Sequence, residues 1–299
     1  MRREEYINEF VQSKPMACLM GAVGLGASWW AAAAVNNDFW WQWAFIGLTC
    51  ALLLLLNRRY AFMSGMTTLM VGMYAILEAA VPEITGTWHH GNLLALAVVF
   101  GLHILYASYE KRRTERFMLV AAIIAAGGLL NVAFLYTLIP IALATVQLRQ
   151  MTFKTLLALA LGTVLPYWLA VGLGLVPLEA LRIPVVQPLL SLSPEAFAPH
   201  LIAAAVALAI GIVAVALNFL HLVKYKQQLR VYNGVTLVLM LYAALMMVVD
   251  GANSLTYLPL LNAMVALQVA HAYRASEALR RYIFVILIIA AEAAIYLLL

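Results

Sequence analysis

Carboxylates and imidazoles are the side chains of this sequence best suited to catalysis or ligand binding. Most of them lie in short polar segments between long apolar runs. Glu83 and the pair His89 and His90 share the segment PEITGTWHH, and Asp250 begins the segment DGANS. Such side chains coordinate metal ions, transfer protons or bind the hydroxyl groups of a ligand. We expect a ligand-binding rim on the outer side of a membrane, formed by Glu78, Glu83, His89, His90, Asp250 and Arg182.

The spacing of the histidines in the sequence restricts the ligands that we expect this rim to bind. Adjacent histidines rarely bind one ion together, and the sequence has no HxxH or HxxxH pattern, so no metal is expected. No cofactor is expected either. Two interpretations stay open, namely binding of a cationic or sugar-bearing ligand and ordinary solvation of helix ends.

Motifs of soluble enzymes are absent from the sequence, which has no GxSxG, GxxxxGK, HExxH or CxxC. An enzyme is therefore less expected than a binding protein. If the protein is an enzyme, Asp38 is the expected catalytic residue, because it is the only acid in the first predicted outer loop, NNDFWWQW.

Glu292 lies near the middle of the last apolar run, 282–299. A carboxyl group at that depth is costly and usually faces a partner or a cavity. Its two interpretations are a proton relay or cation contact and a protonated side chain hydrogen-bonded to a neighbouring helix.

Composition decides the class of protein that must position these residues. Of the 299 residues, 66% are apolar and 10% charged, and the mean hydropathy is +0.95. A soluble domain carries about a quarter charged residues. The sequence therefore predicts an all-α, polytopic membrane helix bundle, a single transmembrane domain over 1–299 without a soluble domain, and it excludes a nucleic-acid-binding protein.

Apolar runs long enough to cross ~30 Å of hydrocarbon define the expected spans. One run, 117–147, is too long for one crossing and holds Gly127, Gly128 and Asn131 at its middle, so we expect a short helical hairpin there. About eleven segments result. Besides that hairpin they are 15–35, 40–56, 61–80, 92–109, 155–175, 200–222, 232–250, 256–273 and 282–299.

Basic residues fix the expected orientation, because short cytoplasmic loops collect lysine and arginine. With the hairpin, a cytoplasmic N-terminus and a periplasmic C-terminus, all of the 18 basic residues except Arg182 lie on the cytoplasmic side. The densest group can hold anionic lipid headgroups, although setting topology explains it equally well. It consists of Lys111, Arg112, Arg113 and Arg116.

Residues 92–175 have a characteristic order of segments. A span is followed by a basic loop (EKRRTERF), a short hairpin, a second basic loop (QLRQMTFK) and another span. This arrangement resembles uncharacterised multi-pass membrane proteins of Bacteroidota and, more loosely, the GT-C class of polyprenyl-phosphate-dependent membrane glycosyltransferases. The second resemblance implies a polyprenyl-phosphate lipid as partner and Asp38 as general base. The long first outer loop and outer domain usual in that class are missing here.

Three functions remain as expectations. The first is a non-catalytic subunit or accessory factor of cell-envelope assembly in the bacterial inner membrane, which binds membrane lipids or other envelope membrane proteins. The second is a GT-C-like lipid-linked glycosyltransferase. The third is a transporter of small solutes or lipids, which would use Glu292 and the acids of the rim.

Overall fold

A computed structural model describes most of the chain. It covers residues 40–60, 69–111, 113–177, 186–188, 194–221, 226–275 and 286–288, and the single residues 22, 23, 26, 30, 62 and 290. Within these residues the regular structure is helical, with no strand. The all-α prediction is therefore confirmed for this part of the protein.

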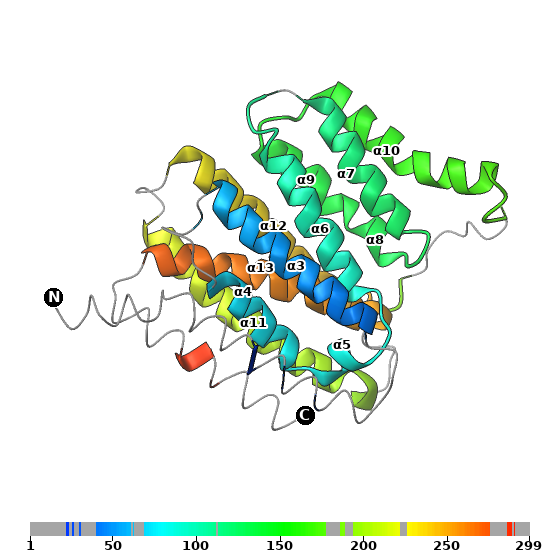
Figure 1. Ribbon diagram of the computed structural model, residues 1–299. Helices are drawn as coiled ribbons and strands as arrows, with labels where there is room; N and C mark the ends of the chain where they lie inside the picture. Colours follow the sequence, from blue (N-terminus) through cyan, green and yellow to red (C-terminus); the bar gives the residue numbers. More distant parts are fainter. Residues whose placement is uncertain are drawn as a thin grey trace.

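The described helices follow the apolar runs closely, because each run is long, rich in leucine and alanine, and ended by polar or charged residues. Figure 1 shows their arrangement, with α13 in the interior. They are α3 (Trp40–Tyr60), α4 (Leu69–Ala79), α5 (Pro82–Gly86), α6 (Gly91–Tyr106), α7 (Thr114–Gly127), α8 (Ala133–Tyr136), α9 (Leu138–Gln147), α10 (Phe153–Gly172), α11 (Pro194–His221), α12 (Gln227–Val249) and α13 (Ser254–Ala275).

Among the described residues, five segments are long and apolar enough to cross a membrane, which supports a membrane-embedded protein. Three more apolar segments are shorter, namely Leu69–Ala79, Gly91–Tyr106 and Ala133–Gln147. The expected number of about eleven crossings is thus not confirmed. The five long segments are Trp40–Tyr60, Phe153–Gly172, His200–Leu220, Gln227–Val249 and Gly251–Tyr273.

The run 117–147 does break where its glycines and asparagine predicted. Helix α7 ends at Gly127, and after a turn α8 and α9 lead the chain back. Arg149, just after α9, lies 4.0 Å from Glu110, just before α7, which brings the two ends of the segment together. The segment is therefore a helical hairpin.

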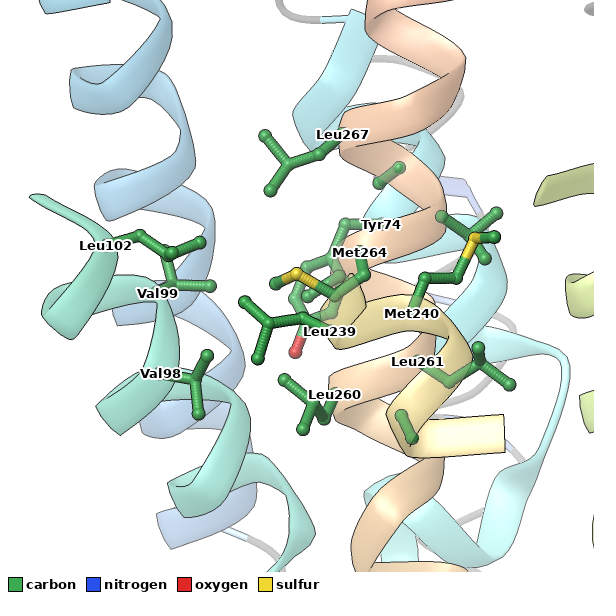
Figure 2. Packing of buried hydrophobic residues seen from close by; sticks show 14 of the residues in the cluster. Tyr74, Val98, Val99, Leu102, Leu239, Met240, Leu260, Leu261, Met264 and Leu267 are labelled. Carbon is green, nitrogen blue, oxygen red and sulfur yellow. The ribbon is translucent and has the colours of Figure 1, made fainter. Parts of the chain in front are cut away.

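The core is built around α13, nearly all of whose residues are buried. Helices α4, α6, α11 and α12 pack against it. Figure 2 shows leucine, valine and methionine side chains from α6, α12 and α13 meeting beside Tyr74 of α4. On the other side of α6, α7 pairs with α10 (Figure 1).

The backbones of α7 and α10 approach each other closely where the two helices pack. A Cβ atom on Gly162 of α10 would collide with the carbonyl oxygen of Met118 in α7. Only glycine therefore allows the two helices to pack at this distance, as small residues do between membrane helices.

The described helices gather basic residues at one end of the bundle. At the basic end, Arg58 and Arg59 close α3, Arg116 lies in the first turn of α7, and Arg149 contacts Gln227. The opposite end holds Glu83, His89, Asn131, His200 and Asp250. The gathering of basic residues expected from the sequence is present, while its assignment to one side of a membrane stays a prediction.

Candidate functional site

The expected rim does not form one open surface in the described residues. Glu78 is completely buried, Asp250 is 1% exposed and His89 is 8% exposed. The side chain of Glu83 is exposed, and Asp38, Arg182, Arg112 and Glu292 lie outside the described residues. Each buried member of the rim is held by its own set of hydrogen bonds.

Asp250 follows α12 and ties the loop before α13 to the hairpin. Its Oδ2 accepts hydrogen bonds from Asn253 Nδ2 at 2.9 Å and from the Tyr257 hydroxyl at 3.1 Å. Asn253 Oδ1 in turn accepts from Asn131 Nδ2 at 3.1 Å. The polar turn of the hairpin is thus satisfied by protein, as a buried polar group must be.

His89 organises the turn between α5 and α6. Its Nε2 donates to the carbonyl of Ile84 at 2.7 Å, and its Nδ1 accepts from the backbone N–H of Gly91 at 3.0 Å. Both ring nitrogens are used, so the ring is the neutral Nε2–H tautomer. Burial lowers the pKa of His89 to about 4, which fits a structural histidine.

The same turn is fastened to α3 by amide groups. Gln42 Nε2 donates to the His89 carbonyl at 2.8 Å, and Asn92 Nδ2 donates to Gln42 Oε1 at 2.8 Å. His90, beside His89, packs its ring edge-on against Trp88. The two neighbouring histidines therefore face different surroundings and do not form a joint site.

Glu83 pairs with His200 through Oε2 and Nε2, which links α5 to the start of α11. Sequence analysis missed His200, because it lies 117 positions away in a run with no other polar pattern. Among the described residues, no group of three or more histidine, cysteine, aspartate or glutamate side chains is arranged to hold a metal ion.

Glu78 lies inside the bundle. Its Oε1 accepts a hydrogen bond from Asn262 Nδ2 of α13 at 3.1 Å. Oε2 of Glu78 and the hydroxyl of Tyr74, one helical turn away, have no hydrogen-bond partner among the described residues. Gln268 of α13 also bonds across helices, because its Nε2 donates to Thr236 Oγ1 of α12 at 2.8 Å.

A hollow with a charged lining lies at the basic end, between α3, α6 and α7. It measures about 790 Å³, and its charged side chains are Arg58, Arg59 and Arg116. The rest of its wall is mainly apolar and includes Leu52 and Phe100. None of the described residues that line it is acidic. We call it the arginine hollow.

Arg116 lines this hollow and also has an unpaired hydrogen-bond donor. Its Nη1 is buried and has no partner among the described residues. Buried polar atoms are nearly always paired, so a missing acceptor indicates a bound group or water. A guanidinium group binds phosphate and carboxylate oxygens best, through paired N–H donors.

Comparison with known proteins adds no relative to this description. No family model, curated protein or solved structure matches the chain. The chemistry of the hollow is therefore inferred from its own residues, and the resemblances to Bacteroidota proteins and the GT-C class stay predictions.

The wall of the arginine hollow is held rigidly by α3 and α6. His103 Nε2 donates to the carbonyl of Leu52 at 2.8 Å, and the hydroxyl of Tyr60 donates to the carbonyl of His103 at 3.1 Å. The guanidinium of Arg59 lies 5.6 Å from the centre of the Tyr60 ring, a cation–π contact that leaves its N–H groups available.

Of the predicted lipid-binding cluster, only Arg116 lines this hollow. Lys111 and Arg113 are exposed on the loop before α7, and Arg112 lies outside the described residues. Arg58 and Arg59 were missed as partners of Arg116, because the sequence places them nearly sixty positions earlier. Only the packing of α7 beside α3 and α6 brings the three together.

Proposed function

We propose that the protein is an integral helix bundle of the bacterial inner membrane, with a cytoplasmic N-terminus and a periplasmic C-terminus. In this proposal it acts as a non-catalytic accessory factor or subunit of cell-envelope assembly that binds an anionic membrane lipid. The arginine hollow is the observation that carries the proposal.

Three features of the hollow favour a lipid over a soluble anion. Its arginines lie at the end of the bundle, where the headgroups of a bilayer are expected. Its wall is apolar below the arginines, with Leu55 and Leu119 half exposed. A soluble phosphate would leave this apolar wall unused, whereas a lipid brings both phosphate and hydrocarbon.

Binding is favoured over catalysis and transport by what the described residues do. The buried acid Asp250 and the buried His89 are occupied by hydrogen bonds within the protein. The glycosyltransferase alternative depends on Asp38 and the transporter alternative on Glu292, both outside the described residues. The lipid-binding function has a described site in which three arginines border an apolar wall.

Native mass spectrometry of the detergent-purified protein tests the proposal. The protein is titrated with dioleoyl phosphatidylglycerol and, separately, with zwitterionic dioleoyl phosphatidylcholine. We expect the anionic lipid to bind at least tenfold more tightly, and the variant carrying Arg58→Gln, Arg59→Gln and Arg116→Gln to lose this preference. Tenfold in Kd corresponds to about 1.4 kcal/mol, close to the smallest contribution expected of one hydrogen bond to a charged group.

A matched control is available at the same end of the bundle. Arg149 and Arg230 are exposed and line a different hollow, between α9 and α12. The variant Arg149→Gln with Arg230→Gln removes a similar charge and is expected to keep the preference for the anionic lipid. If both variants lose it equally, the hollow is not a site and only the net charge of this end attracts lipid.

A further inference from the structure

The arginine hollow does not end at its apolar wall. A second hollow of about 550 Å³ lies directly below it between the same three helices. Leu52 of α3 and Phe100 of α6 line both hollows. The second hollow is almost wholly apolar, with Leu48, Ala97 and Ala126 among its walls. The two hollows therefore adjoin at Leu52 and Phe100, and we call them together the groove.

The groove has a polar end and an apolar end because of how its helices run. From Arg58 back to Leu48, α3 covers ten residues, and at 1.5 Å per residue this is ~15 Å. Half of a ~30 Å hydrocarbon core is also ~15 Å. The apolar groove thus has the length of one leaflet of a bilayer.

The turn of the hairpin closes the far end of the groove. Gly127, Leu130 and Phe134 line it there. Phe134 is completely buried, and a Cβ atom on Gly127 would collide with its ring. This end is therefore a packed floor, whereas Leu48 and Leu130 at its edge are more than half exposed and leave the groove open sideways.

We propose that the groove binds one anionic phospholipid, with its phosphate between Arg58, Arg59 and Arg116 and one acyl chain along α3, α6 and α7 as far as the hairpin turn. This inference rests on the proposed lipid-binding function and deepens it. It assigns the apolar residues a role of their own. The bound acyl chain covers Leu48, Leu52 and Phe100 in place of mobile lipid, and the length of the groove selects for the length of the acyl chain.

Filling the apolar part of the groove tests binding of the acyl chain separately from binding of the phosphate by the arginines. Ala97→Phe on α6 and Ala126→Phe on α7 each place a ring in the lower hollow from a different helix. Ala160→Phe on the exposed face of α10 is the matched control, since Ala160 is exposed and does not line the groove. Native mass spectrometry then compares dioleoyl with dihexanoyl phosphatidylglycerol.

The inference expects both filled variants to bind the dioleoyl lipid about tenfold more weakly and the dihexanoyl lipid as the wild type does. The Ala160→Phe control is expected to bind both lipids normally, and the arginine variant to bind both weakly. Normal binding of the dioleoyl lipid by both filled variants overturns the inference while the arginine site stands. Normal binding by the arginine variant overturns both.

Discussion

Tyr106 and Tyr232 donate hydrogen bonds to each other's backbone carbonyls, at 3.2 and 2.9 Å, although 126 positions separate them. Their rings are stacked with centroids 4.1 Å apart, and the ring of Tyr60 meets both edge-on. This arrangement joins α6 to α12 and fixes the end of α3 that carries Arg58 and Arg59. The aromatic cluster therefore supports one wall of the arginine hollow.

Removing either hydroxyl of this pair is expected to destabilise the protein. Tyr106→Phe deletes one hydrogen bond, and Tyr232→Phe deletes two, because the Tyr232 hydroxyl also accepts from Gln228 Nε2. Each deletion at this buried site costs about 1 kcal/mol of unfolding free energy. Denaturant unfolding in detergent measures the loss. Tyr167→Phe is the control, because the buried Tyr167 hydroxyl has no partner among the described residues and its removal is expected to be neutral. Equal losses in all three variants would contradict the reciprocal pairing.

The sequence predicts the helices well and the sites poorly, for a physical reason. Helix positions follow from local hydropathy, so α3, α6, α10 and α12 lie where their apolar runs predict. The hairpin follows from Gly127, Gly128 and Asn131, which break a helix locally. Which side chains meet depends instead on helix rotation and packing.

The pairings that decide the sites illustrate this limit. Glu78 was expected at an open rim, but α4 turns it towards α13, where it meets Asn262. His200 meets Glu83 because α11 begins beside α5. Arg116 lines the same hollow as Arg58 because α6 packs against both α3 and α7. No spacing in the sequence encodes these distances.

The hairpin turn is expected to depend on the Asn131 side chain. Its Oδ1 accepts the backbone N–H of Ala133 at 2.8 Å, and its Nδ2 donates to Asn253. Asn131→Ala leaves both partners unpaired, and we expect it to lower the unfolding free energy by about 1–3 kcal/mol. Leu130→Ala, at an exposed site in the same turn, is expected to cost less than ~0.5 kcal/mol. Similar unfolding curves for the two variants would contradict this role.

Gly162 is expected to tolerate no side chain. In Gly162→Ala the new methyl group meets the Met118 carbonyl oxygen, so α7 and α10 must separate. Overpacking of this kind typically costs about 1–3 kcal/mol. The same change at Gly172 of α10, where nothing lies within 4 Å of the new atom, is expected to leave the melting temperature unchanged or to raise it. A Gly162→Ala protein as stable as wild type would show that the two helices do not pack this closely.

His89 is expected to make the fold sensitive to acid. Burial lowers its pKa from the ordinary 6.5 to about 4 in the folded protein. Between these values the unfolded chain binds a proton that the folded protein does not, so stability falls as the pH falls from 6.5 and the whole contribution is lost below about 4. Melting temperatures from pH 8 to pH 4 measure this fall.

The variant His89→Gln separates this histidine from other groups. It is less stable at pH 8, because it loses the bond to Ile84 or to Gly91, but its stability is expected to change less between pH 6.5 and 4. A variant with the same slope as the wild type would assign the acid sensitivity to another group.

The proposed orientation predicts which engineered thiols a membrane-impermeant reagent reaches in intact cells. Gln227 is exposed at the basic end and Trp88 is exposed at the opposite end. In a background without Cys18 and Cys50, a cysteine replacing Trp88 is expected to be labelled from outside, and one replacing Gln227 only after the cells are opened. This follows because short cytoplasmic loops collect arginine and lysine. Labelling of the Gln227 position from outside would reverse the orientation and place the arginine hollow in the outer leaflet.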